Sequence, residues 1–205
     1  MKFQAEPFNW PKGPTNDRAS FALIVVDMQN DYCSPDCYMD KAGYDLNLLR
    51  APIEPLKNVL TKARKCGLEV IYTRHSENLN PESSDENGTS AYQSFGWEIV
   101  SELQPLENEM VFNKTTISAF LSGGLHEYLQ EKNIKNLIFC GNTIDVCVHS
   151  SLRVAEDFDY NCMLLEDCCG AVNDELHKWS VESIKIEDGV FGAVSNARTF
   201  IRDLK

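Results

Sequence analysis

The sequence of 205 residues lacks a hydrophobic run long enough to cross a membrane. A membrane-spanning helix needs about 20 consecutive apolar residues, whereas the apolar run nearest the N-terminus covers only residues 21–26. Residues 1–19 also lack the apolar core of a secretory signal and are predicted to form an extended lead-in. We therefore expect a single cytoplasmic domain, residues 20–205, that has no membrane partner.

Basic residues are scarce relative to acidic ones. The chain has 19 Lys and Arg against 31 Asp and Glu, which gives a formal net charge of −12. Such a polyanion repels nucleic acids and anionic lipid surfaces, so neither is expected as a partner. The hydrophobic fraction of 43% is ordinary for a globular domain, and this length is sufficient to bury a substantial core.

The eight cysteines lack the paired C-x2-C spacing that is typical of structural zinc sites. Cys33 and Cys37 form one C-x3-C, and Cys168 and Cys169 are adjacent, so a zinc site is the alternative to free thiols. Disulfides are not expected without a secretory signal. Three thiols in predicted helices and strands are expected to be buried and free: Cys66, Cys140 and Cys162.

Predicted strands and helices alternate along the chain. The continuous apolar run at 21–26 is typical of a strand buried on both faces of a parallel sheet. Residues 52–66 have helical spacing, with Pro near the start and Gly just after the end. Further strands are predicted at 68–72, 110–112, 137–140, 162–165 and 183–186, further helices at 97–103, 121–132 and 145–158, and a long polar loop at 76–97. The alternation predicts an α/β fold of three layers, αβα, around a doubly wound sheet.

Three chemically reactive residues follow predicted strands. Asp27 comes directly after the run at 21–26, Lys114 follows the strand at 110–112, and Cys147 lies one turn into the helix after another strand. In open parallel sheets, ligands bind beyond the carboxyl ends of the strands. Each residue alone has an ordinary explanation, as a turn residue, a solvated lysine or a buried thiol, so the hypothesis of a site depends on the three together.

The combination suits acyl transfer through a covalent thioester. A thiol near a helix N-terminus and beside a lysine is expected to have a lowered pKa. A neighbouring carboxylate can accept the thiol proton and later return it to a leaving amine. Backbone N–H groups of the turn before the helix can hold the oxyanion of a tetrahedral intermediate. Asp27 is therefore the candidate base and Cys147 the candidate nucleophile.

The sequence around these residues resembles the isochorismatase-like cysteine hydrolases. The resemblance covers residues 20 to 175 in order, and its three principal segments form a specific set. The matching segments are ALIVVDMQNDYC (22–33), NKTTISAF (113–120) and GNTIDVCVHSSLRVAEDFDY (141–160), with further matches at TRH (73–75) and LLEDCCGAVND (164–174).

The resemblance implies roles for individual residues. The catalytic Asp, Lys and Cys of the family fall on Asp27, Lys114 and Cys147. The family's non-proline cis peptide falls on Asn142–Thr143, and the backbone N–H groups of Thr143 and Cys147 are expected to form the oxyanion hole. The resemblance further implies a mostly parallel six-stranded sheet and assembly as a homodimer or homotetramer.

The resemblance is greatest to ureidoacrylate amidohydrolase and related ureide and biuret hydrolases, through residues 38–58, 94–105 and 146–153. It implies cleavage of a C–N bond in a small amide or ureide, without cofactor or metal. Nicotinamidase is the alternative, but that branch has a metal-binding Asp-x-His where this sequence has His75-Ser76-Glu77. Metal binding by His75 and Glu77 stays open, as does a non-catalytic binding protein of the same fold.

Five further residues are candidates for substrate binding. Asn30 and Tyr32 follow Asp27 closely, Asn142 lies in the turn before the nucleophile, and Trp97 and Phe120 could cover a planar substrate. Core packing is an equally good explanation for the two aromatic side chains. His149 is excluded from the site because it should point elsewhere on the helix, and no function is assigned to Cys168 and Cys169.

Overall fold

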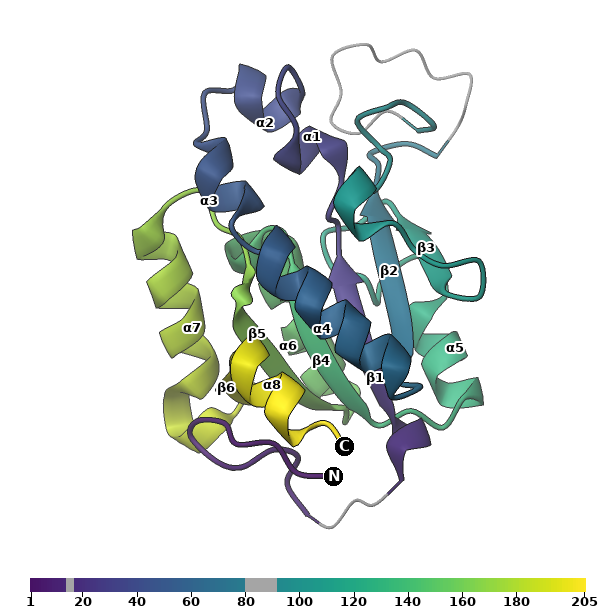
Figure 1. Ribbon diagram of the computed structural model, residues 1–205, viewed down its shortest axis with the longest axis vertical. Helices are drawn as coiled ribbons and strands as arrows, with labels where there is room; N and C mark the ends of the chain where they lie inside the picture. Colours follow the sequence, from purple (N-terminus) through teal and green to yellow (C-terminus); the bar gives the residue numbers. More distant parts are fainter. Residues whose placement is uncertain (14–16, 80–91) are drawn as a thin grey trace.

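The computed structural model describes residues 1–13, 17–79 and 92–205. Its centre is a six-stranded, entirely parallel sheet with the strand order β3-β2-β1-β4-β5-β6 (Figure 1). The predicted α/β class and the six-stranded parallel sheet are therefore confirmed. The strands are β1 (Phe21–Val26), β2 (Glu69–His75), β3 (Met110–Lys114), β4 (Asn136–Gly141), β5 (Asn161–Cys169) and β6 (Ala193–Ser195).

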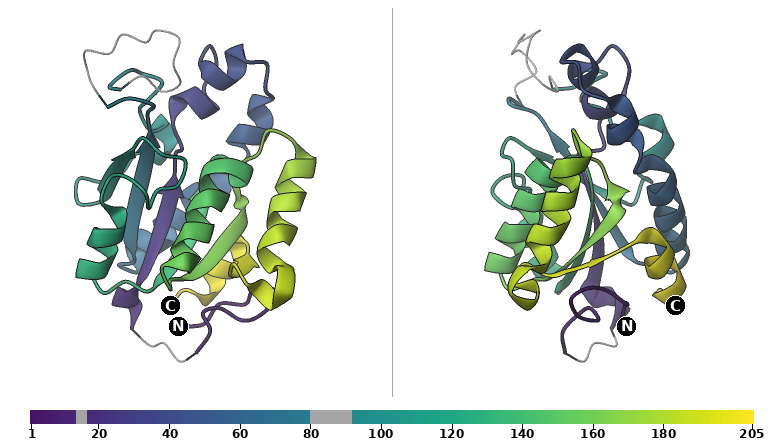
Figure 2. Two further views of the ribbon diagram at one scale, coloured as in Figure 1. Left: turned by 180° about the vertical axis from the view of Figure 1, so that it is seen from behind. Right: turned by 90° about the vertical axis from the view of Figure 1, so that its left-hand side faces the viewer.

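Helices cover both faces of the sheet and its upper edge. The α-helices are α1 (Asn30–Cys33), α2 (Tyr38–Lys41), α3 (Leu46–Arg50), α4 (Ile53–Lys65), α5 (Leu125–Glu131), α6 (His149–Asp157), α7 (Asp174–Gly189) and α8 (Ala197–Asp203). Two short 3-10 helices, η1 (Arg18–Ser20) and η2 (Ser101–Leu103), and one π-helix, η3 (Ile144–Val148), complete the regular structure. Helices α4 and α8 lie on one face, and α5, α6 and α7 lie on the other (Figure 2).

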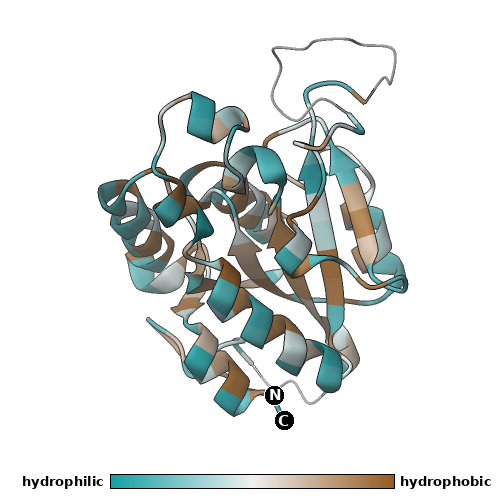
Figure 3. Cartoon of the chain, turned by 45° about the horizontal axis from the view of Figure 1, so that its top comes forward, coloured by the Kyte–Doolittle hydropathy of each residue, from teal (hydrophilic) through white to brown (hydrophobic). Residues whose placement is uncertain are grey.

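The sheet forms the core because its central strands are apolar throughout. All six residues of β1 and all six of β4 are buried, which is the pattern of a parallel sheet covered on both faces. Apolar residues fill the strands while the outer helix faces are polar (Figure 3). The predicted helix at 52–66 is present as α4, and its apolar side chains face the sheet.

Three predicted elements are wrong in type or extent. The strand predicted at 183–186 lies within α7. Asn173 caps the start of this helix by accepting from the N–H of Leu176. The last strand of the sheet is β6. The helix predicted from 121 begins only at Leu125, after two glycines with positive φ. Only η2 remains of the helix predicted at 97–103. The residues before η2 are extended and pair with the segment after β1, where Ile99 forms an antiparallel bridge with Gln29.

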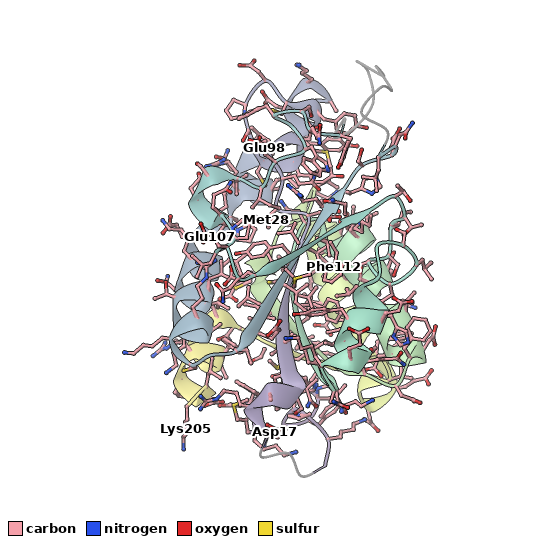
Figure 4. The ribbon with its side chains drawn as sticks, turned by 90° about the vertical axis from the view of Figure 1, so that its right-hand side faces the viewer. Asp17, Met28, Glu98, Glu107, Phe112 and Lys205 are labelled. Carbon is pink, nitrogen blue, oxygen red and sulfur yellow. The ribbon has the colours of Figure 1, made fainter. Side chains whose placement is uncertain are left out.

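The N-terminal segment packs against the amino-terminal end of the sheet. Phe3 and Trp10 are buried and exchange backbone hydrogen bonds, and Glu6 forms an antiparallel bridge to Val194 of β6. Figure 4 labels Asp17 and Lys205 at this end of the molecule, opposite Met28 and Glu98 at the carboxyl ends of the strands. No helix in the described part of the chain is long and apolar enough to cross a membrane.

Gly141, the last residue of β4, is required by a close approach to β1. Its φ is 116°, and a Cβ atom at this position would lie 2.0 Å from the carbonyl oxygen of Val26. Asn142, the residue after Gly141, donates its own N–H to the same oxygen at 2.9 Å. The glycine therefore lets the ends of the two central strands meet.

Replacing Gly141 with Ala should destabilise the fold by about 2 kcal/mol or more, because steric overlap adds to backbone strain. Urea unfolding of the two proteins measures the loss. Gly67→Ala is the matched control, since Gly67 also has a positive φ (67°) but no atom within 4 Å of the added Cβ. The control should cost about 1 kcal/mol, and equal losses in both variants would contradict the steric explanation.

Candidate active site

Asp27, Lys114 and Cys147 meet at the carboxyl ends of the central strands. The Nζ atom of Lys114 lies 2.8 Å from Oδ2 of Asp27 and 3.5 Å from Sγ of Cys147. Asp27 and Lys114 are fully buried, and 9% of Cys147 is exposed. The structure therefore brings together a carboxylate, an ammonium and a thiol from three distant parts of the sequence.

Strand ends position all three side chains. Asp27 follows β1 directly and has a positive φ of 48°, which turns the chain sharply out of the sheet. Lys114 is the last residue of β3, level with His75 at the end of β2. Cys147 lies on the π-helix η3, which follows β4 after a short turn. Since these strands are parallel, their carboxyl ends share one edge.

The loop after β3 folds back onto the ammonium group of Lys114. The Nζ atom donates to the carbonyl oxygens of Thr116 and Ile117, both at 3.0 Å. Burial lowers the pKa of Lys114, but the Asp27 carboxylate and the Cys147 sulfur raise it by more, so that the net direction is upward. The side chain is therefore a fixed, buried cation.

The pKa of the Cys147 thiol is raised, and the predicted lowering is wrong for the site as it stands. Burial is the largest cause, and the Asp27 carboxylate acts in the same direction through its charge and a hydrogen bond. Lys114 opposes them and is outweighed. At rest the sulfur is therefore a neutral thiol that donates a hydrogen bond to the carboxylate of Asp27.

The turn between β4 and η3 is held by the side chain of Asn142. Its Nδ2 atom donates to the carbonyl oxygen of Leu49 at 2.9 Å and to Sγ of Cys33 at 3.1 Å, and its Oδ1 accepts from the N–H of Gly170 at 3.1 Å. The Asn142–Thr143 peptide is cis. The amide of Asn142 is thus committed to the protein, which argues against the predicted role in substrate binding.

Asn30 is also committed to protein contacts. Its Nδ2 donates to the carbonyl oxygen of Phe95 at 2.8 Å, and its Oδ1 accepts from Ser34. These bonds hold the 95–98 segment against α1, so a direct contact of Asn30 with substrate is not favoured. Tyr32 is buried in the same helix, close to the site in sequence, and its contact with a substrate stays a prediction.

The two aromatic candidates have different surroundings. The ring of Trp97 lies under the guanidinium of Arg74, 3.5 Å from its centroid, and meets Tyr92 edge-on at 4.9 Å. Phe120 packs among Phe139, Phe158 and Tyr160, with centroids 5.8 to 6.5 Å apart. Phe120 is therefore a core residue, which favours core packing over contact with a substrate. Trp97 belongs to the segment beside Gln29.

Three polar residues at this edge were missed as candidates. Thr73 of β2 donates its hydroxyl to Oδ1 of Asp27 at 2.6 Å. Gln29 binds the backbone of His75 and the carbonyl oxygen of Trp97. Ser151 donates to the carbonyl oxygen of Cys147 at 2.6 Å and accepts from the N–H of Ala119. The signal for Thr73 was present, since it follows a predicted strand that neighbours β1.

His75 lies beside the buried pair without completing a metal site. Burial is the largest cause that lowers its pKa, followed by the charge of Lys114. Within the described ranges, no group of three His, Cys, Asp or Glu side chains is placed to hold a metal ion. Residues 80–91 of the predicted polar loop at 76–97 lie outside the described residues.

The remaining histidine and cysteine predictions concern residues away from the triad. His149 stacks on Trp179, and its Nδ1 accepts from Arg153 at 2.9 Å. These contacts turn the ring away from Asp27 and Lys114. All eight cysteines are free thiols. Cys140 and Cys162 are buried as predicted, whereas Cys66, at the C-terminal cap of α4, is partly exposed.

Solved structures of isochorismatase-like hydrolases share this architecture. A cysteine hydrolase from Pseudomonas syringae pv. phaseolicola superposes with a TM-score of 0.78 at 22% identity, over 92% of this chain and 94% of that one. An isochorismatase-like hydrolase from Alkaliphilus metalliredigens superposes with a TM-score of 0.76 at 21% identity, over 91% of this chain and 99% of that one. At these identities the likeness establishes the fold.

The sequence itself establishes the family. The family model of the isochorismatase domain matches residues 21–199, so the chain belongs to the isochorismatase family and is a hydrolase of that family. Ureidoacrylate amidohydrolase RutB from Acinetobacter baylyi is 32% identical over 203 residues, 88% of this chain and 82% of that protein. RutB from Azorhizobium caulinodans is 30% identical, over 88% of each chain. The predicted family is confirmed.

Removing the ammonium of Lys114 should be costly because it leaves the Asp27 charge buried without its counter-ion. Lys114→Met should lower the free energy of unfolding by about 3 to 5 kcal/mol, measured by urea denaturation. Lys57→Met is the matched control: Lys57 pairs with Glu54 at 2.9 Å, but on the surface. It should lose about 0.5 kcal/mol or less. Similar losses in both variants would show that burial does not decide the strength of the pair.

Proposed function

We propose that this protein hydrolyses a C–N bond of a small amide or ureide through a thioester at Cys147. The observation that carries the proposal is the contact of one buried ammonium, Lys114, with both the carboxylate of Asp27 and the sulfur of Cys147. Thiol, base and cation are the groups that nucleophilic acyl transfer requires. The substrate class is supported by relatives at 32% and 30% identity that are named ureidoacrylate amidohydrolases.

In the first half-reaction, the thiol proton passes to Asp27 as the sulfur attacks the carbonyl carbon of the substrate. The raised pKa of Cys147, caused first by burial and then by the Asp27 charge, supports a concerted transfer of this kind. Lys114 stabilises the negative charge that develops on the sulfur and keeps the carboxylate of Asp27 in place. Asp27 then returns this proton to the substrate nitrogen, the C–N bond breaks, and a thioester forms as the amine or ammonia leaves.

Backbone donors are expected to stabilise the tetrahedral intermediate. Thr143 is the residue before η3 and Cys147 is the fourth residue of that helix, and the N–H of Thr143 meets no acceptor among the described residues. A preorganised donor of this kind contributes a large share of rate acceleration in acyl transfer. In the second half-reaction, Asp27 accepts a proton from water, which attacks the thioester and releases the acid.

Cys147→Ala should abolish turnover while the protein remains folded, because no other group in the site can form the thioester. Asp27→Asn should lower kcat about 10²- to 10⁴-fold, the usual contribution of a general base. Ammonia release measures both losses, and thermal unfolding confirms the fold. Cys66→Ala, which removes a partly exposed thiol away from the site, should keep full activity. Turnover by Cys147→Ala would exclude the thioester mechanism.

A substrate panel separates the proposed class from its alternatives. The panel contains ureidoacrylate, carbamoyl amino acids and nicotinamide, each assayed with and without a chelator. We expect ammonia release from a ureide or carbamoyl compound at a rate the chelator leaves unchanged. Chelator-sensitive release from nicotinamide would favour the nicotinamidase alternative, and no release from any compound would favour a binding protein of the same fold.

A further inference from the structure

The base of the proposed reaction has a second fixed partner besides Lys114. Oδ2 of Asp27 faces the ammonium of Lys114 at 2.8 Å, while Oδ1 accepts from the hydroxyl of Thr73 at 2.6 Å. Thr73 and Asp27 are both fully buried. The two oxygens of the carboxylate are therefore each held by a side chain from a different strand, Lys114 of β3 and Thr73 of β2.

The direction of the hydroxyl hydrogen of Thr73 follows from a second contact. The backbone N–H of Asp27 donates to Oγ1 of Thr73 at 3.3 Å and to the carbonyl oxygen of Thr73 at 3.2 Å. Because Oγ1 already accepts from this N–H, its own hydrogen is free to point at Oδ1 of Asp27. A short hydrogen bond of this kind fixes the direction in which the carboxylate faces.

The alternation of side chains along β2 places Thr73 on the site's side of the strand. Tyr72, the residue before it, accepts a hydrogen bond from Arg64 of α4 on the face of the sheet that α4 covers. His75, two residues after Thr73, lies level with Lys114. Odd-numbered positions at this end of β2 therefore face the buried pair.

We propose that Thr73 is a positioning residue of the reaction, whose hydroxyl holds the Asp27 carboxylate oriented toward Lys114 and Cys147. The inference rests on the proposed function. It adds a contribution from β2, a strand that supplies none of the three reactive groups. Thr73 touches the base and not the substrate, so its loss should affect kcat more than KM.

Thr73→Val tests the role, because valine has the same shape and the same preference for a strand but no hydroxyl. Without the donor, kcat for ureidoacrylate should fall about tenfold while KM stays close to the wild-type value. Thr73→Ser, which keeps the hydroxyl, should restore the wild-type kcat. Tyr72→Phe is the matched control, since it removes a hydroxyl from the adjacent position on the other face and should leave kcat unchanged.

A second readout needs no substrate. The rate at which iodoacetamide alkylates Cys147 should fall by a similar factor in Thr73→Val, because the base is no longer held toward the sulfur. An unchanged rate in both assays, with normal thermal unfolding, would overturn the role of Thr73 while the proposed function stands. A wild-type enzyme that releases no ammonia would instead overturn the proposed function, and the alkylation rate would still decide the role of Thr73.

Discussion

The buried ion pair between Asp27 and Lys114 is the constraint on which the rest of the site depends. Each charge is completely removed from solvent, and an unpaired charge at such a depth would cost several kcal/mol. The ends of β1 and β3 must therefore stay aligned although β2 lies between them. Fully buried apolar strands, with Gly141 allowing β4 to approach β1, provide the rigidity that keeps this alignment.

The same pair determines the resting state of Cys147, the proposed nucleophile. Because burial and the carboxylate of Asp27 raise the pKa of Cys147, the sulfur is a thiol until a substrate accepts its electrons. Oxidation of cysteine proceeds through the thiolate, so a protonated sulfur with 9% exposure is protected between turnovers. In the proposed reaction, the sulfur then becomes reactive when a carbonyl carbon arrives and Asp27 takes the thiol proton.

The triad could be predicted from sequence because all three residues follow strands, and parallel strands end at one edge. The amides of Asn30 and Asn142 could not be assigned in this way, since their partners are backbone groups far away in sequence. The pKa of Cys147 was predicted in the wrong direction because a sequence shows the neighbouring charges but not the depth of burial. The three-residue strand β6 was missed because it is too short for a periodic pattern.

The contacts of Lys114 with Thr116 and Ile117 hold the loop after β3 against the reactive groups, below the segments that cover this edge of the sheet. The groups of the proposed reaction lie on strand ends and beside one tightly bonded loop, whereas α1, α2, α3 and the 92–100 segment lie above them at the same edge. Within these upper segments, Cys33 and Leu49 accept from Asn142 and so hold the turn before Cys147, whereas exposed side chains such as that of Tyr38 could be exchanged without disturbing this turn. Relatives could therefore differ in the compounds that reach the site while they keep the same reactive groups. In experiments that exchange segments between relatives, the end of β1 is a natural boundary.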